Sequence, residues 1–84
     1  MKIVLYLDGS VSSDESALFL RELGVQFEEV DVRTNAGRVR LLKRTQQPYV
    51  PAFELKRNHS IGIIVGLNKE LLRRELQKKL FKFI

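Results

Sequence analysis

Residues 45–51 read Thr-Gln-Gln-Pro-Tyr-Val-Pro, and this stretch separates two kinds of structure along the chain. Pro48 disfavours helical geometry in the residue before it, so a helix that we expect up to Arg44 ends here. Pro51 has no N–H to donate, and a strand tolerates such a residue where it opens. The stretch therefore predicts a junction between a helix and a strand that begins at Val50.

Downstream of this junction, the pattern predicts a hairpin and then a helix. Residues 50–55 and 60–65 have strand character, and the charged and polar residues 56–59 form the turn between them. Residues 66–68 then lead into a last helix with an apolar side. That side is formed by leucines that recur every four residues, Leu72, Leu76 and Leu80.

Upstream of the junction, the pattern predicts a strand, a helix and a second strand. Residues 3–7 form a continuous apolar run, which suits a strand buried on both faces. Ser12 and Glu15 have the spacing of a capping box, so we expect the first helix to be capped at Ser12 and to stop at Gly24. Residues 25–32 begin as an alternating strand.

The order of elements predicts an α/β fold of the β-α-β-α-β-β-α type. Its first half is a βαβ unit with a parallel pair of strands, and its second half is an antiparallel hairpin with a covering helix. We therefore expect a four-stranded mixed sheet flanked by three helices. The expected organisation is a single domain over residues 1–84, with residues 78–84 as a C-terminal extension. The hydrophobic tail Leu80–Ile84 could pack on its own sheet or form a partner or dimer contact, and we favour packing on its own domain.

The composition excludes several classes of function. The chain has 84 residues and no cysteine, so disulfides, thiolate metal sites and thiol catalysis are excluded. His59 is the one histidine, which excludes a histidine-rich metal site, and we expect it to be exposed in its turn. No apolar run reaches the roughly 20 residues that span a membrane, and the apolar run at 3–7 is too short for a signal peptide. We expect a cytoplasmic protein without a membrane partner.

Three stretches, in the right order and at the right spacing, resemble the glutaredoxins. Residues 23–32 are similar to the glutaredoxin segment after the first helix. Residues 45–51 resemble Thr-Gly-Gln-Arg-Thr-Val-Pro, which carries a cis-proline, and residues 64–68 resemble Ile-Gly-Gly-Phe-Asp. The resemblance covers residues 1–78 and implies a thioredoxin-like fold with the sheet order second, first, third, fourth strand. It also implies a cis bond between Val50 and Pro51.

The glutaredoxin active-site motif, Cys-Pro-Tyr-Cys, is where this sequence departs from the family. The motif falls on Ser10-Val11-Ser12-Ser13, so serine stands at both cysteine positions. A hydroxyl is a far weaker acid than a thiol and forms no disulfide. Serine also needs a base for nucleophilic work, and no histidine or lysine lies nearby in the sequence. We expect a vestigial motif that caps the helix and has no catalytic role.

Binding groups that the resemblance implies are mostly those of the backbone. Glutaredoxins hold glutathione partly with a lysine before the motif and an arginine-like residue before Thr-Val-Pro, and this chain has Asp8 (or Leu7) and Pro48 there. The loss of two charge-assisted bonds predicts weak glutathione binding and no other cofactor. The expected ligand site, for a protein or peptide at the cis-proline edge, comprises Val50, Pro51, Gly66, Leu67 and Asn68.

Charge is divided unevenly along the chain. Residues 1–31 contain two basic and seven acidic residues, a balance of −5, and residues 32–84 contain thirteen basic and three acidic residues, a balance of +10. Such asymmetry suggests an anionic partner. The basic residues that could contact nucleic-acid phosphates are Lys56, Arg57, Lys69, Arg73, Arg74, Lys78, Lys79 and Lys82. A solvated helix face is the commoner explanation for them, since few aromatics accompany them.

Three functions remain open on the sequence. The first is a redox-inactive glutaredoxin-like domain that acts as a binding module. The second is a thiol–disulfide oxidoreductase, with a role in electron transport and cell redox homeostasis, whose two cysteines are replaced by serine in this sequence. The third is a nucleic-acid-binding protein that uses the basic second half.

Overall fold

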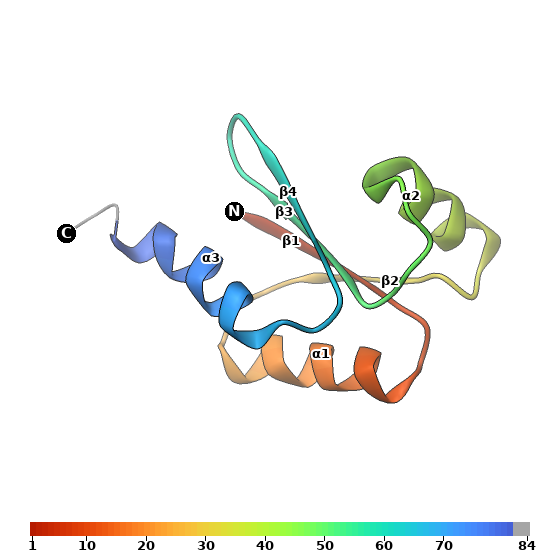
Figure 1. Ribbon diagram of the computed structural model, residues 1–84, viewed down its shortest axis with the longest axis horizontal. Helices are drawn as coiled ribbons and strands as arrows, with labels where there is room; N and C mark the ends of the chain where they lie inside the picture. The colour runs from red at the N-terminus through yellow and green to blue at the C-terminus, as the bar shows by residue number, and fades with distance from the viewer. Residues whose placement is uncertain (82–84) are drawn as a thin grey trace.

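The computed structural model describes the backbone of residues 1–81 and the side chains of residues 1–77. Its elements follow the predicted order and are shown in Figure 1: β1 (Lys2–Leu7), α1 (Val11–Glu22), β2 (Glu28–Asp31), α2 (Asn35–Thr45), β3 (Ala52–Lys56), β4 (Ile61–Val65) and α3 (Lys69–Phe81). The proposed extension at residues 78–84, including the packing of the tail Leu80–Ile84, lies outside the side chains that the structure describes.

The four strands form one mixed sheet in the order β2-β1-β3-β4, which confirms the predicted arrangement. β1 is parallel to β2, with Val4 opposite Glu28, and antiparallel to β3. β2 is shorter than the sequence predicts, because it begins at Glu28. Val25 and Phe27 pack instead against the core from the connecting segment. Apolar side chains can therefore fill a core without belonging to a strand.

The core lies on both faces of the sheet, as the apolar run at residues 3–7 predicts. Ile3 and Leu5 point to one face, where they pack with residues of α1 and α3 such as Leu20 and Leu72. Val4 and Tyr6 point to the other face, where Leu41 of α2 joins them. Figure 1 shows α1 and α3 on one side of the strands and α2 on the other.

The caps of α1 and α2 show where local sequence decides the ends of helices. The expectation that Ser12 caps α1 is wrong, because Ser10 is the N-cap and its side chain accepts a hydrogen bond from the Ser13 N–H. Ser12 already lies inside the helix, so its spacing from Glu15 has no capping role. Gly24, with φ of +72°, follows the C-cap of α1 and confirms the predicted stop. α2 begins after Thr34, which caps it.

A buried acidic residue in the core was not predicted from the sequence. Glu54 of β3 is fully buried on the α2 face. The Tyr6 hydroxyl donates a 2.7 Å hydrogen bond to one of its carboxylate oxygens, and the Lys56 amine lies 3.4 Å from the other. Burial, followed by the contact with Glu54, raises the pKa of Tyr6 to about 12. Neighbouring strands are thus joined by a polar contact inside the core.

Candidate functional site

The three stretches singled out in the sequence meet at one end of the sheet. In the register, Tyr6 of β1 lies opposite Ala52 of β3, which lies opposite Val65 of β4. Residues 8–13 follow the end of β1, residues 50–51 precede β3 and residues 66–68 follow β4. Because these strands alternate in direction, all three connections leave the sheet at the same end. The candidate site is therefore a set of three loops beside the N-terminus of α1.

The two serines at the cysteine positions are hydrogen-bonded to each other. The Ser10 hydroxyl donates to the Ser13 hydroxyl across 3.2 Å. Ser13 is fully buried, and its hydroxyl donates to an Asp8 carboxylate oxygen at 2.9 Å and accepts from the Asp8 N–H at 3.2 Å. A hydroxyl has one hydrogen to donate and two lone pairs. All three are used at Ser13, which fixes its role as part of the cap.

Asp8 does not activate either serine as a nucleophile. Its carboxylate also accepts a hydrogen bond from the Ser10 N–H at 3.0 Å. Hydrogen bonding from Ser10 and from Ser13 holds the pKa of the Asp8 carboxyl below its usual value. A carboxylate with a lowered pKa is a poor proton acceptor for an alcohol. The serine cluster thus satisfies the end of a helix and provides no base.

The loop before β3 is joined to the turn after β4. The Val50–Pro51 bond is cis. Pro51 is buried, and its carbonyl accepts a 2.7 Å hydrogen bond from the Gly66 N–H. Two stretches that are distant in the sequence are brought together by this bond. Within residues 1–81, no hydrogen bond uses the N–H or the carbonyl of the half-buried Val50. Val50 therefore presents free backbone groups at the end of the sheet.

The last two predicted ligand residues have structural duties of their own. The Asn68 side-chain oxygen accepts a hydrogen bond from the Leu71 N–H at 3.0 Å, which caps α3. Leu67 is half-buried and packs against the core on the α1 side. The Asn68 side-chain NH₂ makes no hydrogen bond within the described residues, and its oxygen has one further lone pair.

Gln47 supports this loop and was missed as a functional residue. Its side-chain oxygen accepts from the Tyr49 N–H at 2.6 Å, and its amide donates to the Tyr49 carbonyl at 3.1 Å. The same amide contacts the Thr45 hydroxyl at 3.0 Å. The backbone directly before Val50 is thereby held by a side chain. The sequence contained an indication of this role, because the glutaredoxin stretch that residues 45–51 resemble also has glutamine at the position of Gln47.

Arg33 places a cation beside the loop that follows β1, near the acidic residues Asp8 and Asp14. Its guanidinium pairs with Asp31 at 2.9 Å and lies so close to Gly9 that a β-carbon there would meet it at 2.8 Å. Pairing with Asp31 raises the pKa of Arg33, and Asp8 and Asp14 add to the effect from farther away. The φ of +80° at Gly9 favours glycine there, and the flexible Arg33 side chain lies over it.

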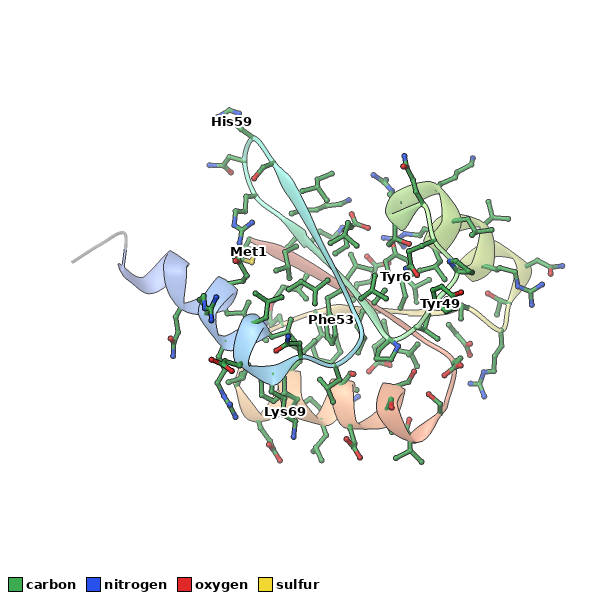
Figure 2. All side chains as sticks on the ribbon, viewed as in Figure 1. Met1, Tyr6, Tyr49, Phe53, His59 and Lys69 are labelled. Carbon is green, nitrogen blue, oxygen red and sulfur yellow. The ribbon has the colours of Figure 1, made fainter. Side chains whose placement is uncertain are left out.

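The predicted nucleic-acid surface is divided by ion pairs. Arg57 pairs with Glu75 at 2.7 Å, and Lys56 approaches Glu54 at 3.4 Å. The guanidinium carbon of Arg73 lies 5.2 Å from the centroid of the Phe19 ring, so the cation contacts an aromatic face. His59 is exposed at the hairpin tip, as expected (Figure 2). Among the side chains that the structure describes, the basic residues of the hairpin and α3 are thus partly engaged by acidic and aromatic neighbours, and Lys78, Lys79 and Lys82 lie outside those side chains.

Two further classes of site are absent from the part of the chain that the structure describes. None of its helices is long and apolar enough to cross a membrane. Among the same residues, no group of three or more histidine, cysteine, aspartate or glutamate side chains is placed to hold a metal ion.

Comparison with known proteins supports the fold. No protein-family model matches the chain, and no curated protein sequence matches it either. Among solved structures, a glutaredoxin from Archaeoglobus fulgidus superposes with a TM-score of 0.70 at 19% identity, over 87% of this chain and 83% of that one. A thioredoxin from Plasmodium falciparum superposes with a TM-score of 0.67 at 20% identity, over 92% of this chain and 83% of that one. The chain therefore has a thioredoxin-like fold of the glutaredoxin type, built without cysteine.

Proposed function

We propose that this domain is a binding module that captures an extended peptide at the loop before β3 and has no thiol–disulfide activity. The observation that carries the proposal is the free N–H and carbonyl of Val50, which stand beside a helix end where both hydroxyls are already hydrogen-bonded. A peptide strand that pairs with these two groups gains main-chain hydrogen bonds, as in other cases of strand addition.

The surroundings of Val50 favour an extended peptide over a small anion. Gln47 fixes the backbone of Tyr49, so the loop is ordered before a ligand arrives, which reduces the entropic loss on binding. Tyr49, which precedes Val50 in the chain, is labelled in Figure 2 and is 70% exposed. An exposed aromatic next to free backbone groups offers a peptide both hydrogen bonds and apolar contact.

Selection from a displayed library of random peptides tests the proposal. The expected outcome is a family of related peptides whose affinity for the Val50→Pro variant, which lacks the N–H, falls by about tenfold or more. The matched control is Ile61→Ala, which changes an exposed apolar residue at the start of β4, the end away from the site, and is expected to bind like the wild type.

A second measurement keeps the test independent of how Val50→Pro folds. Each backbone nitrogen of a selected peptide is methylated in turn, and binding to the wild-type domain is measured. Loss of binding at one or two adjacent positions supports pairing with the Val50 backbone. Equal binding by all methylated peptides, or a library that yields no binder, contradicts the proposal.

A further inference from the structure

Two helix faces of opposite charge have no partners within the described molecule. On α1, the side chains of Asp14, Glu15 and Glu22 are exposed and make no ion pair with any residue that the structure describes. On α2, the same holds for three cations, Arg38, Lys43 and Arg44. The other charged residues of these helices, Arg21 and Arg40, are paired with glutamates. The two faces thus carry three free charges each.

Exposed apolar side chains accompany the free charges on both helices. On α1, Val11 is 73% and Leu18 53% exposed, and on α2, Val39 is 51% and Leu42 45% exposed. Half of the eight large hydrophobic side chains exposed in the described structure belong to these two helices. Solvent-facing helix positions are normally polar, so apolar side chains in this place indicate a surface that is covered by a partner.

Helical spacing places the charged and apolar residues of each helix together. On α1, residues 11, 14, 15, 18 and 22 are separated by three or four positions and follow one side of the helix. On α2, residues 38, 39, 42 and 43 lie within about 140° of the helix circumference, whereas Arg44 lies about 100° beyond Lys43 and outside this side of the helix. Each side is therefore an amphipathic stripe, acidic on α1 and basic on α2.

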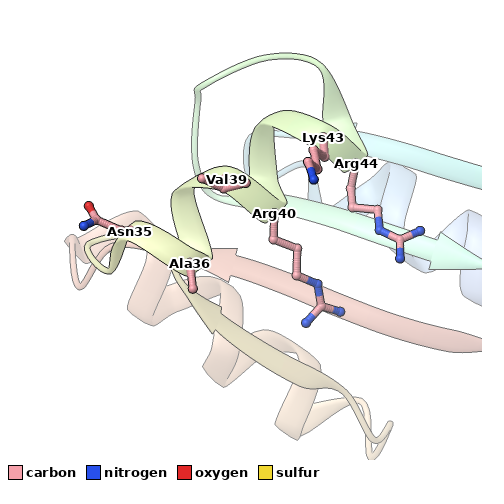
Figure 3. Close-up of a pocket in the computed structure, with 6 residues that line it drawn as sticks. All are labelled: Asn35, Ala36, Val39, Arg40, Lys43 and Arg44. Carbon is pink, nitrogen blue, oxygen red and sulfur yellow. The ribbon is translucent and has the colours of Figure 1, made fainter.

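The basic stripe borders a shallow groove. This groove runs along α2, has a volume of about 500 Å³ and is lined by Asn35, Ala36, Val39, Arg40, Lys43 and Arg44 (Figure 3). The Arg40 guanidinium is committed to Glu28, at 2.6 and 3.1 Å. Lys43 and Arg44 remain as free cations beside an apolar floor at Val39. An occupant that fits must supply carboxylates and apolar side chains at helical spacing.

We propose that the occupant is the α1 helix of a second copy of this chain. Its Asp14, Glu15 and Glu22 supply carboxylates for the free cations of α2, while Leu18 covers the apolar floor at Val39. A nucleic-acid backbone would neutralise the cations and leave Val39 and Leu42 uncovered. α1 and α2 lie on opposite faces of the sheet, so the contact is heterologous and links copies head to tail.

Sedimentation of the wild-type domain at rising concentration and at two salt concentrations tests the contact. We expect self-association at about 0.01 M salt that disappears at about 1 M salt, because the screening length falls from about 30 Å to about 3 Å. A wild type that stays monomeric at about 1 mM protein and low salt overturns the proposal.

Three charge variants assign the association to the two stripes. One carries Asp14→Lys, Glu15→Lys and Glu22→Lys, and a second carries Arg38→Glu, Lys43→Glu and Arg44→Glu. Each is expected to associate about tenfold or more weakly than the wild type. The third carries all six changes and keeps the wild-type net charge of +5, since the two sets cancel. It is expected to associate as the wild type does.

Recovery of self-association in the variant with all six substitutions distinguishes pairing of the two stripes from an effect of net charge or damaged folding. A six-fold variant that is folded by circular dichroism and still monomeric overturns the proposal. So does a wild type that is monomeric and binds a single-stranded oligonucleotide through the α2 cations. Peptide binding at Val50 is expected to be unchanged in the α2 variant, so this proposal can fail without the proposed function failing.

Discussion

At the scale of single residues, the two serines at the start of α1 have the hydrogen-bonding capacity of alcohols and lack the acidity of thiols. Ser10 and Ser13 keep the geometry of a reactive pair, with their oxygens 3.2 Å apart. What is absent is a group that ionises, since an alcohol does not become an anion at a helix N-terminus as a thiol does. The same positions that would carry a dithiol serve here as the helix cap.

Introducing thiols at residues 10 and 13 is expected to allow a disulfide to form but to give little reductase activity. The Ser10→Cys/Ser13→Cys variant should close a disulfide, measured as loss of alkylation that a reductant reverses. Asp8 lies 2.9 Å from the oxygen of residue 13, and its negative charge opposes a thiolate there. We therefore expect poor glutathione-disulfide reductase activity that rises when Asp8→Asn is added. Activity of the serine-containing protein in this assay would contradict the account.

Gln46 shows a local conflict that one substitution should relieve. It is the C-cap of α2 and has φ of +57°, a left-handed conformation that favours glycine. The glutaredoxin stretch that residues 45–51 resemble has glycine at this place. We expect Gln46→Gly to raise the free energy of unfolding by roughly 0.5–1 kcal/mol. Urea denaturation measures it, with the exposed Gln26→Gly as a control that is not expected to stabilise.

Residue-level roles were harder to predict than the positions of the motifs. Counting along the sequence placed Ser10 and Ser13 at the helix start, yet the capping box at Ser12 was wrong by two residues. A serine near an acidic residue fits several caps, and the preceding turn at Gly9 decides which one forms. The Ser13–Asp8 bond depends on a tertiary turn and has no signature in the sequence.

At the scale of elements, the contact between β1 and β3 includes a polar pair inside the core. The Tyr6 hydroxyl is the hydrogen-bond donor to the buried Glu54 carboxylate. Removing it with Tyr6→Phe leaves a buried charge poorly satisfied, and should lower the free energy of unfolding by roughly 1.5–3 kcal/mol. Tyr49→Phe removes a hydroxyl from a side chain that is 70% exposed, and it is the matched control. Equal stability of the two variants would contradict this role.

The same pair predicts a loss of stability in alkali. The folded-state pKa of Tyr6, about 12, is above the unfolded value of about 10. The contribution of the protonated hydroxyl is therefore complete below pH 10 and is lost as the pH rises towards 12. Denaturation at several alkaline pH values should show that the difference between wild type and Tyr6→Phe shrinks over this range. If the difference in stability between the two proteins stays constant from pH 10 to 12, the Tyr6 hydroxyl does not have the raised pKa that its burial implies.

The elements themselves were predicted well because their signals are local and repeated. The apolar run at residues 3–7 requires burial on two faces, and the helices that follow supply those faces. The second strand was placed too early, since Val25 and Phe27 have strand character but are used as core side chains of a connecting segment. Alternation of apolar and polar residues shows which side chains are buried. Where the strand begins is decided by backbone hydrogen bonding to the neighbouring strand.

At the scale of the whole molecule, the fold redistributes the charge that the sequence divides into two halves. Arg33 comes from the basic half and returns to the acidic end near Gly9. The resemblance to glutaredoxins places Asp8 and Pro48 where that family has cations, which implies few charge-assisted bonds to the anion glutathione. We expect it to bind more weakly than about 1 mM. Saturable shifts of the Val50, Gly66 and Asn68 amides below that concentration would contradict this expectation.

The central claim is that one end of this sheet binds a peptide without reacting with it. Amide chemical shifts of the labelled domain, followed while a selected peptide is added, test it most directly. If the peptide binds at the proposed site, we expect saturable shifts centred on Val50 and Gly66 in the wild type, with no change in the protein's mass. Shifts confined to α2 or to the β3–β4 hairpin, or a covalent adduct on Ser10, would contradict it.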